Sequence, residues 1–281
     1  MPDVLSDFST PSLASAIKAN WKDYYRTLGR APGAEWHAGP HFTWLLTGLP
    51  DTFNNVILET RLPPDGAGEV IGQALAHFRS RGVRRLSWWT EAGAQAAPLE
   101  EHLVAQGLTF EAGGTGMAAN LMALPMDLPT PTGLTIAAVE DKASLQHWAR
   151  IVTIGFGLPS GSEAIWLALL ADLVFQLPLR NYLATLDGQP VGASQLCLGA
   201  GVAGIYNVAC VPEARGRGVG TMITLAPLLE ARRLGFNIAI LQASRLGYNV
   251  YRRLGFQDCG RLSHYRWENE FQRSPVNGDG A

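Results

Sequence analysis

Seven consecutive residues in the second half of the chain combine three glycines with two arginines: Arg215-Gly216-Arg217-Gly218-Val219-Gly220-Thr221. Apolar residues at helical spacing follow them, so a helix is expected to begin near Val219. Glycines let a ligand approach the backbone closely, and the amide groups at a helix N-terminus attract anions. Arg215 and Arg217 add formal positive charge, and the Thr221 hydroxyl adds a donor. The segment predicts a binding site for a diphosphate.

Two common phosphate-binding loops do not fit this segment. A nucleoside triphosphate loop requires Gly-Lys-Ser or Gly-Lys-Thr, and the segment contains no lysine. A dinucleotide loop requires G-x-G-x-x-G and an acidic residue about twenty positions later, a region where Asn237 and Ala239 stand here. A tight turn without a ligand is the simpler alternative for clustered glycines. The flanking arginines and the following helix favour the anion site.

Together with a second motif downstream, this loop resembles the GNAT superfamily of acyl-CoA-dependent N-acyltransferases. The family's pyrophosphate motif is Arg or Gln, two variable residues, Gly, one variable residue, then Gly or Ala. Arg215, Gly218 and Gly220 match it. Tyr251-Arg-Arg-Leu-Gly-Phe256 is similar to the family's Tyr-x-x-Leu-Gly-Phe motif. The resemblance covers residues 134–268 and extends to the tandem layout with a degenerate N-terminal copy that occurs in the family.

The resemblance implies an N-acetyltransferase that moves an acetyl or other acyl group from acetyl-CoA, its co-substrate, to a primary amine. The amine attacks the thioester directly through a tetrahedral intermediate. Tyr251 is the implied general acid for the leaving thiolate, because a phenol with a pKa near ~10 is protonated at neutral pH. The acceptor would be a small-molecule amine or a peptide N-terminus. A non-catalytic acyl-CoA-binding sensor or interaction module on the same fold is the alternative, and retention of Tyr251 argues against it.

The implied cofactor contacts come from the strand before the loop, from the loop itself and from two residues further along. They are Val208, Ala209, Cys210, Val211, Arg215, Gly216, Arg217, Gly218, Val219, Gly220, Thr221, Ser244 and Asn249. Substrate is expected to enter beside residues 154–162, where glycines and a proline suggest a mobile lip.

The general base is left unassigned. Family members often place a glutamate on the strand before the loop, and Asn207 stands in that stretch here. Because an amide cannot take a proton, either the amine arrives neutral through a water chain or a carboxylate elsewhere helps. Glu163 and Asp172 are candidates, although such acids more often belong to a solvated helix face. His264 is a third, although a lone histidine is usually satisfied by local hydrogen bonds.

Hydrophobic periodicity predicts the elements around these motifs. In the second half we expect strands at 181–185, 191–198, 205–211 and 238–241, and helices from 219 to Gly235 and from 246 to Gly255. Asp187-Gly188 predicts a hairpin turn. A weaker copy upstream has a helix at 69–81, a strand at 85–90 and a helix at 99–106. Leu103 stands there where Tyr251 stands later, so the first copy lacks the polar chemistry.

The predicted fold class is α/β, of the α+β type, with two tandem GNAT-like domains. Each domain is expected to be a mixed, mostly antiparallel central sheet flanked by helices. Three prolines and a glycine at 124–133 indicate a connection between them. We expect a degenerate GNAT-like domain at 1–126, a linker at 127–133, a catalytic domain at 134–270 and a disordered tail at 271–281.

Composition narrows the class of partner. A net charge of −2 offers no electrostatic footprint for nucleic acid. No stretch approaches the ~20 apolar residues of a membrane span, and the N-terminus does not resemble a secretory signal, so a cytoplasmic location is expected. The three cysteines, Cys197, Cys210 and Cys259, form no C-x-x-C pair, so neither a disulfide nor a metal site is expected. The acceptor amine and the oligomeric state stay open.

Overall fold

The computed structural model of the chain describes residues 4–49, 54–63, 65–92, 96–175 and 177–269. The tail expected at 271–281 lies outside the described residues. The chain divides into two compact units. The first comprises Met1–Pro32 and Gly114–Arg261, and the second comprises Gly33–Gly113 and Leu262–Ala281.

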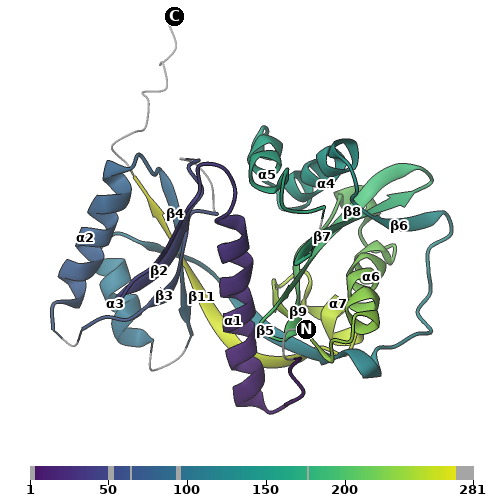
Figure 1. Cartoon of the computed structure of the whole chain (residues 1–281), viewed down its shortest axis with the longest axis horizontal. Helices are drawn as coiled ribbons and strands as arrows, with labels where there is room; N and C mark the ends of the chain where they lie inside the picture. Colours follow the sequence, from purple (N-terminus) through teal and green to yellow (C-terminus); the bar gives the residue numbers. More distant parts are fainter. Residues whose placement is uncertain (1–3, 50–53, 64, 93–95, 176, 270–281) are drawn as a thin grey trace, which may run out of the picture. The chain divides into compact units, whose positions relative to one another are not determined.

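The sheet of the first unit has the strand order β5-β10-β9-β8-β7-β6 (Figure 1). The strands are β5 (Thr109–Asn120), β6 (Leu134–Ala138), β7 (Leu179–Leu186), β8 (Gln189–Gly199), β9 (Val202–Cys210) and β10 (Ile238–Ala243). Neighbouring strands are antiparallel except β9 and β10, which are parallel. Asp187 and Gly188 both have positive φ in the turn between β7 and β8, as their residue types predict. The mixed, mostly antiparallel sheet confirms the expected fold class.

Helices cover both faces of this sheet. They are α1 (Thr10–Leu28), α4 (Lys142–Gly155), α5 (Ser162–Leu170), α6 (Val219–Arg233) and α7 (Tyr248–Arg253), with short 3-10 turns at Leu121–Ala123 and Pro212–Ala214. A Cβ atom at Gly192 would lie 2.9 Å from Val219 Cγ1 of α6. A Cβ atom at Gly155 of α4 would lie 2.7 Å from Ala209 Cβ, and Ala209 pairs with Ala193. Because adjacent strand residues point to opposite faces, α4 and α6 cover opposite faces.

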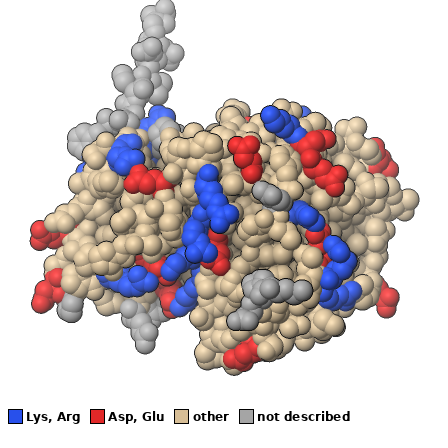
Figure 2. Space-filling view, viewed as in Figure 1, with Lys and Arg blue, Asp and Glu red and all other residues tan. Residues whose placement is uncertain are grey.

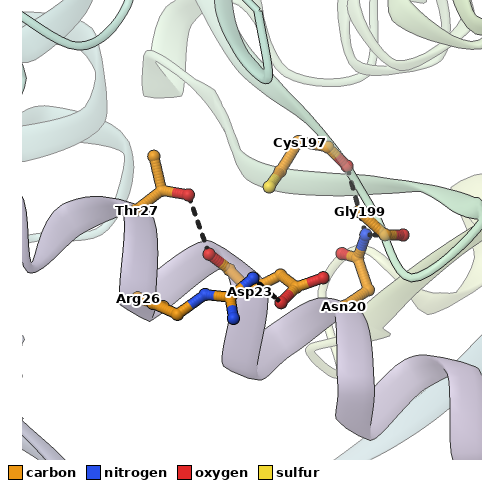
Figure 3. A network of polar contacts seen from close by, with 6 residues as sticks. All are labelled: Asn20, Asp23, Arg26, Thr27, Cys197 and Gly199. Atoms are coloured by element: carbon orange, nitrogen blue, oxygen red, sulfur yellow. Dashed lines mark hydrogen bonds and ion pairs between the residues drawn. The ribbon is translucent and has the colours of Figure 1, made fainter. Parts of the chain in front are cut away.

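Helix α1 is part of the first unit, although it lies far in sequence from the strands on which it packs. Leu13, Ala16 and Ile17 form a core with Ile238 and Ile240 of β10, among others. Asn20 is fully buried, and its Nδ2 donates to the carbonyl oxygens of Cys197, Gly199 and Val202 at 3.2, 2.9 and 3.3 Å. Figure 3 shows two of these contacts beside the Asp23–Arg26 pair of the same helix. A buried amide that satisfies strand-end carbonyls ties the helix to β8 and β9.

The second unit has the strand order β1-β2-β3-β4-β11. Its elements are β1 (Glu35–Ala38), β2 (Phe42–Leu46), β3 (Val56–Thr60), α2 (Ala67–Ser80), β4 (Arg85–Glu91), α3 (Ala97–Ala105) and the end of β11 (Gln257–Glu268). Strands β3 and β4 are parallel and pair at Val56–Ser87 and Ile57–Trp88, with α2 between them in sequence. The order strand, helix, parallel strand thus occurs in both units. Leu103, which stands in the upstream copy where Tyr251 stands in the later one, is fully buried in an apolar core.

The division into units does not follow the boundary expected at residues 127–133. Residues 4–32 belong with the 114–261 segment, and residues 262–269 belong with the 33–113 segment. The apolar side of α1 is buried against β10, and β11 pairs with β4 from Leu262–Glu91 to Glu268–Arg85. The expected linker packs in the first unit, where Pro131 Cγ lies 3.4 Å from the position of a Cβ atom at Gly218.

Candidate active site

Strand β9 carries a bulge just before the glycine-rich loop. Its register with β8 passes from Ala193–Ala209 to Gln195–Tyr206, so two residues of β9 stand opposite Ser194. One of them is Asn207, whose φ of 51° lies in the left-handed region. A bulge bends its strand and interrupts regular pairing. The parallel pairing of β9 with β10 stops at Ala203 and Gly204, so the backbone of residues 205–210 is not paired with β10.

The glycine-rich loop opens helix α6 in a conformation that suits an anion. Gly216 and Gly218 have φ values of 74° and 85°, which non-glycine residues rarely adopt. Intrahelical bonding begins with the amides of Thr221 and Met222, which donate to Gly218 O at 3.1 and 3.2 Å. The amides of Val219 and Gly220 precede the first intrahelical hydrogen bond, so the helix itself provides no acceptor for them. Such free amides and the helix dipole attract negative charge.

The bulged strand, the loop and α7 surround one cavity of about 270 Å³ in the first unit. Ten of the fourteen predicted site residues line it: Val208, Ala209, Cys210, Arg215, Gly216, Gly218, Gly220, Thr221, Ser244 and Tyr251. The other four do not. Val219 is the first residue of α6 and is buried, Arg217 and Asn249 are exposed, and the Val211 amide donates to Val191 O at 3.0 Å.

Tyr251 is almost completely buried at the wall of this cavity, with 7% of its surface exposed. A Cβ atom at Gly247 would lie 2.7 Å from its Cε2 and 3.0 Å from its Oη, so the phenol lies directly over that glycine. Burial raises the pKa of Tyr251 above its usual value near 10. The phenol therefore carries its proton at neutral pH and is a donor facing the cavity.

Cys210 contributes a neutral thiol to the same wall. Burial raises the pKa of Cys210 to about 11, against the opposing effect of the Arg215 charge. A thiol with that pKa is protonated at pH 7 and is a poor nucleophile. Arg215 also connects the loop to α4, because its Nη2 donates to Gly155 O at 3.0 Å.

The three candidate bases do not lie among the described residues that line the cavity. Glu163 Oε2 accepts from the amide of Gly161, the residue just before α5, at 3.1 Å. Asp172 is exposed. His264 belongs to the second unit, where it stacks on Trp89 with ring centroids 4.3 Å apart. Asn207 is held by hydrogen bonds from its Nδ2 to Gln195 Oε1 at 2.9 Å and to Tyr24 Oη at 3.1 Å.

Six further residues line the cavity: Gly155, Phe156, Leu246, Gly247, Val250 and Arg253. Gly155 and Phe156 lie in the segment predicted as a substrate lip. In the sequence, Leu246 and Val250 stand at helical spacing, which predicts only that they pack on one face of a helix. The close approach of Gly247 to Tyr251 depends on side-chain placement, which spacing does not reveal.

Three further features bear on other kinds of site: surface charge, metal ligands and helix hydrophobicity. On the face shown in Figure 2, basic and acidic side chains are interspersed over a mostly uncharged surface. Within the described residues, no three His, Cys, Asp or Glu side chains gather where they could hold a metal ion. None of the helices in the described ranges is both long and apolar enough to cross a membrane.

Comparison with known proteins finds a family model that matches the part of the chain around this site. Residues 178–258, which include β9, the loop and α7, match the family model described as "Acetyltransferase (GNAT) domain". These residues are therefore similar to a GNAT acetyltransferase domain, a fold that supports acyl transfer in general. No protein of curated function matches the sequence.

Solved structures agree on the fold. The chain is similar to a GCN5-related N-acetyltransferase from Kribbella flavida, with 20% identity and a TM-score of 0.64 over 93% of this chain and 96% of that one. A GCN5-related N-acetyltransferase from Sphaerobacter thermophilus gives 19% identity and a TM-score of 0.59 over 95% and 94%. A tandem GNAT protein from the clavulanic acid biosynthesis pathway gives 14% and 0.60 over 95% and 96%. The fold is that of GNAT proteins.

Proposed function

We propose that this protein is an N-acetyltransferase that moves an acetyl group from acetyl-CoA to a primary amine of a small molecule or a peptide N-terminus. The observation that supports this most directly is that one cavity is lined by three features suited to this reaction. A protonated phenol, a glycine-rich helix start and an interrupted strand edge all line it.

The lining fits a co-substrate that carries a diphosphate and a thioester. The left-handed glycines 216 and 218 leave the first amides of α6 uncovered by Cβ atoms, and Arg215 adds a positive charge. These groups would hold the diphosphate, and the backbone of residues 208–210 would hold the thiol-bearing arm. When bound, acetyl-CoA supplies an acyl group already activated as a thioester.

Two groups of the chain act on the reacting atoms. A backbone N–H at the end of β9 donates to the carbonyl oxygen, on which negative charge gathers as the amine attacks. One preorganised donor of this kind contributes about 3 kcal/mol to transition-state stabilisation. Tyr251 Oη then donates its proton to the departing sulfur, as a general acid. Its raised pKa keeps that proton available across the neutral range.

The test compares Tyr251→Phe with Tyr248→Phe for thiol release from acetyl-CoA over a panel of amines, amino acids and peptides. Loss of the general acid should lower kcat by about 10²-fold or more, while the Kd for acetyl-CoA from calorimetry changes little. Tyr248 is the matched control, because its hydroxyl bonds Asp258 at 3.0 Å and does not line the cavity.

Two results would contradict the proposal in different ways. Normal turnover by Tyr251→Phe would remove the acid assignment. Binding of acetyl-CoA without amine-dependent thiol release across the panel would indicate the non-catalytic sensor instead.

A further inference from the structure

A chain of side-chain amides fixes the orientation of Asn207, which lies in the stretch where the family often has a glutamate. Asn207 Nδ2 donates both its hydrogens, to Gln195 Oε1 at 2.9 Å and to Tyr24 Oη at 3.1 Å. Gln195 Nε2 in turn donates to Asn181 Oδ1 at 2.7 Å, and both of these residues are fully buried. Because both hydrogens are used, only Oδ1 of Asn207 is left to meet a ligand.

Helix α1 holds this arrangement in place. Tyr24 stacks on Tyr206 with ring centroids 4.2 Å apart and an interplanar angle of 10°. The Tyr206 hydroxyl donates to Asn20 Oδ1 at 2.7 Å, and Asn20 is fixed by three carbonyl oxygens. The ionisable groups around the amides include Tyr24, Tyr25, Tyr206 and Cys197, with the Asp23 side chain near Cys197. Burial raises the pKa of the three tyrosines and of Cys197, to about 12 for Cys197, so these four groups are neutral near pH 7.

Asn207 Oδ1 is the end of this network that a ligand can meet. Among the described residues none donates to this oxygen, and it is not one of the buried unpartnered atoms, so it contacts solvent. The next residue, Val208, lines the cavity, and the charged side chains among the described lining residues are Arg215 and Arg253. An ammonium ion would meet positive charge and no carboxylate among the described lining residues, whereas an uncharged N–H can donate to a neutral acceptor oxygen without that repulsion.

We propose that the enzyme takes its acceptor as the uncharged amine, held by a hydrogen bond from the amine N–H to Asn207 Oδ1, and therefore selects weakly basic amines such as α-amino groups over lysine-type alkylamines. This inference rests on the proposed acetyltransferase function and names its class of substrate.

The reaction balances without a protein base. The amine lone pair forms the C–N bond, the C–S bond breaks, and sulfur takes the proton of Tyr251 Oη. The nitrogen releases its surplus proton to water, and the phenolate regains one from solvent. The products are an amide and a thiol.

Two isomers test the selection: lysine methylamide acetylated on the ε-nitrogen, with a free α-amine, and the same compound acetylated on the α-nitrogen. With pKa values of about 7.7 and 10.4, the two free amines differ roughly 400-fold in their uncharged fraction at pH 7. We expect kcat/KM to favour the α-amine at pH 7. For the ε-amine it should rise about tenfold per pH unit between pH 7 and 9, as the free base does.

Asn207→Asp tests the role of the oxygen. The carboxylate can accept from the Tyr24 hydroxyl, and from Gln195 after its amide rotates, so the substitution suits the same pocket. It should raise kcat/KM for the ε-amine at pH 7 by about tenfold or more relative to the α-amine and flatten the pH profile. Gln189→Glu makes the same chemical change at an exposed residue of the β7–β8 hairpin and should leave the ratio unchanged.

The outcomes distinguish a failure of this inference from a failure of the proposed acetyltransferase function. Thiol release that favours the ε-amine at pH 7, or is independent of pH in the parent enzyme, overturns the uncharged-acceptor proposal and leaves the acetyltransferase standing. Binding of acetyl-CoA with no release from either isomer overturns both. An unchanged preference in a folded Asn207→Asp protein overturns the assignment of Asn207.

Discussion

Gly247 sets the position of the Tyr251 phenol. Its φ of −84° is ordinary, so alanine would not strain the backbone there. The added Cβ atom would instead lie 2.7 Å from Cε2 of the ring and push the phenol away. A displacement near 1 Å at a reacting group can cost about 10²-fold in rate. We predict that Gly247→Ala lowers kcat by about 10- to 100-fold and changes the Kd for acetyl-CoA much less, as measured by steady-state kinetics and calorimetry.

Gly72→Ala is the control for that substitution. Gly72 lies inside helix α2 of the second unit, and a Cβ atom there meets nothing closer than 3.5 Å. Alanine should stabilise that helix by about 0.5–1 kcal/mol and leave kcat unchanged. Full activity of Gly247→Ala would show that the phenol position is not limiting.

Residue identities were predictable where a motif is local. Arg215, Gly218 and Tyr251 are recognised within two short stretches, and all three line the cavity. Tyr24 was not predictable as a partner of Asn207, because 183 positions separate them and neither has a distinctive neighbourhood. The missing glutamate was evident in the sequence, whereas the amide network in its place depends on the packing of α1.

The start of helix α6 is the element on which cofactor binding depends. Gly218 has a φ of 85°, where a β-branched residue is strained, and Pro131 packs close by. We predict that Gly218→Val weakens acetyl-CoA binding by about tenfold or more in calorimetry, since the first amides of the helix would be displaced.

Gly235 offers a matched control at the other end of the same helix. It has a φ of 90° and open space around its Cα, so Gly235→Val introduces comparable backbone strain away from the cavity. Stability should fall in both variants, and acetyl-CoA affinity should fall only in Gly218→Val. Equal loss of affinity would mean that general destabilisation explains the effect.

Elements with strong periodicity and clear stop signals were predicted closely. The expected helix from 219 to Gly235 corresponds to Val219–Arg233, and the expected strand at 85–90 corresponds to Arg85–Glu91. Helix α1 was not predicted. Its apolar side chains repeat at helical spacing, but the surface that buries them is formed by strands far along the chain.

At the scale of the whole molecule, cutting the chain at the expected linker should damage both units. A 134–281 fragment lacks both α1, which covers the buried side chains of Ile238 and Ile240, and β5, which pairs with β10. A 1–126 fragment lacks the strand that pairs with β4. We predict that the 134–281 fragment loses the cooperative thermal unfolding of the intact chain, measured by circular dichroism.

A rearranged fragment is the control: residues 114–261 joined through a long Gly/Ser linker to residues 4–32. It contains the described parts of the first unit and should unfold cooperatively. Cooperative unfolding of the 134–281 fragment at the temperature of the intact chain would contradict the assignment of α1 and β5 to this unit.

Composition and motifs predicted the fold class, but they did not predict which segments of the chain belong to which unit. Proline and glycine mark 124–133 as irregular, which is correct locally, yet compactness is decided by which apolar faces are buried together. Those pairings, such as Ile17 near Gly116 or Leu262 with Glu91, join distant segments and leave no signature in any short window.

The interleaved path has a consequence for synthesis on the ribosome. The first helix emerges early and must wait, unpartnered, until the strands that bury it have been translated. The second unit, in turn, cannot gain its last described strand before residues 262–269 leave the exit tunnel. Neither unit is therefore complete until the residues around 261 have been translated, and a nascent chain stalled or truncated before them would expose apolar surface from each unit, as a substrate for chaperones.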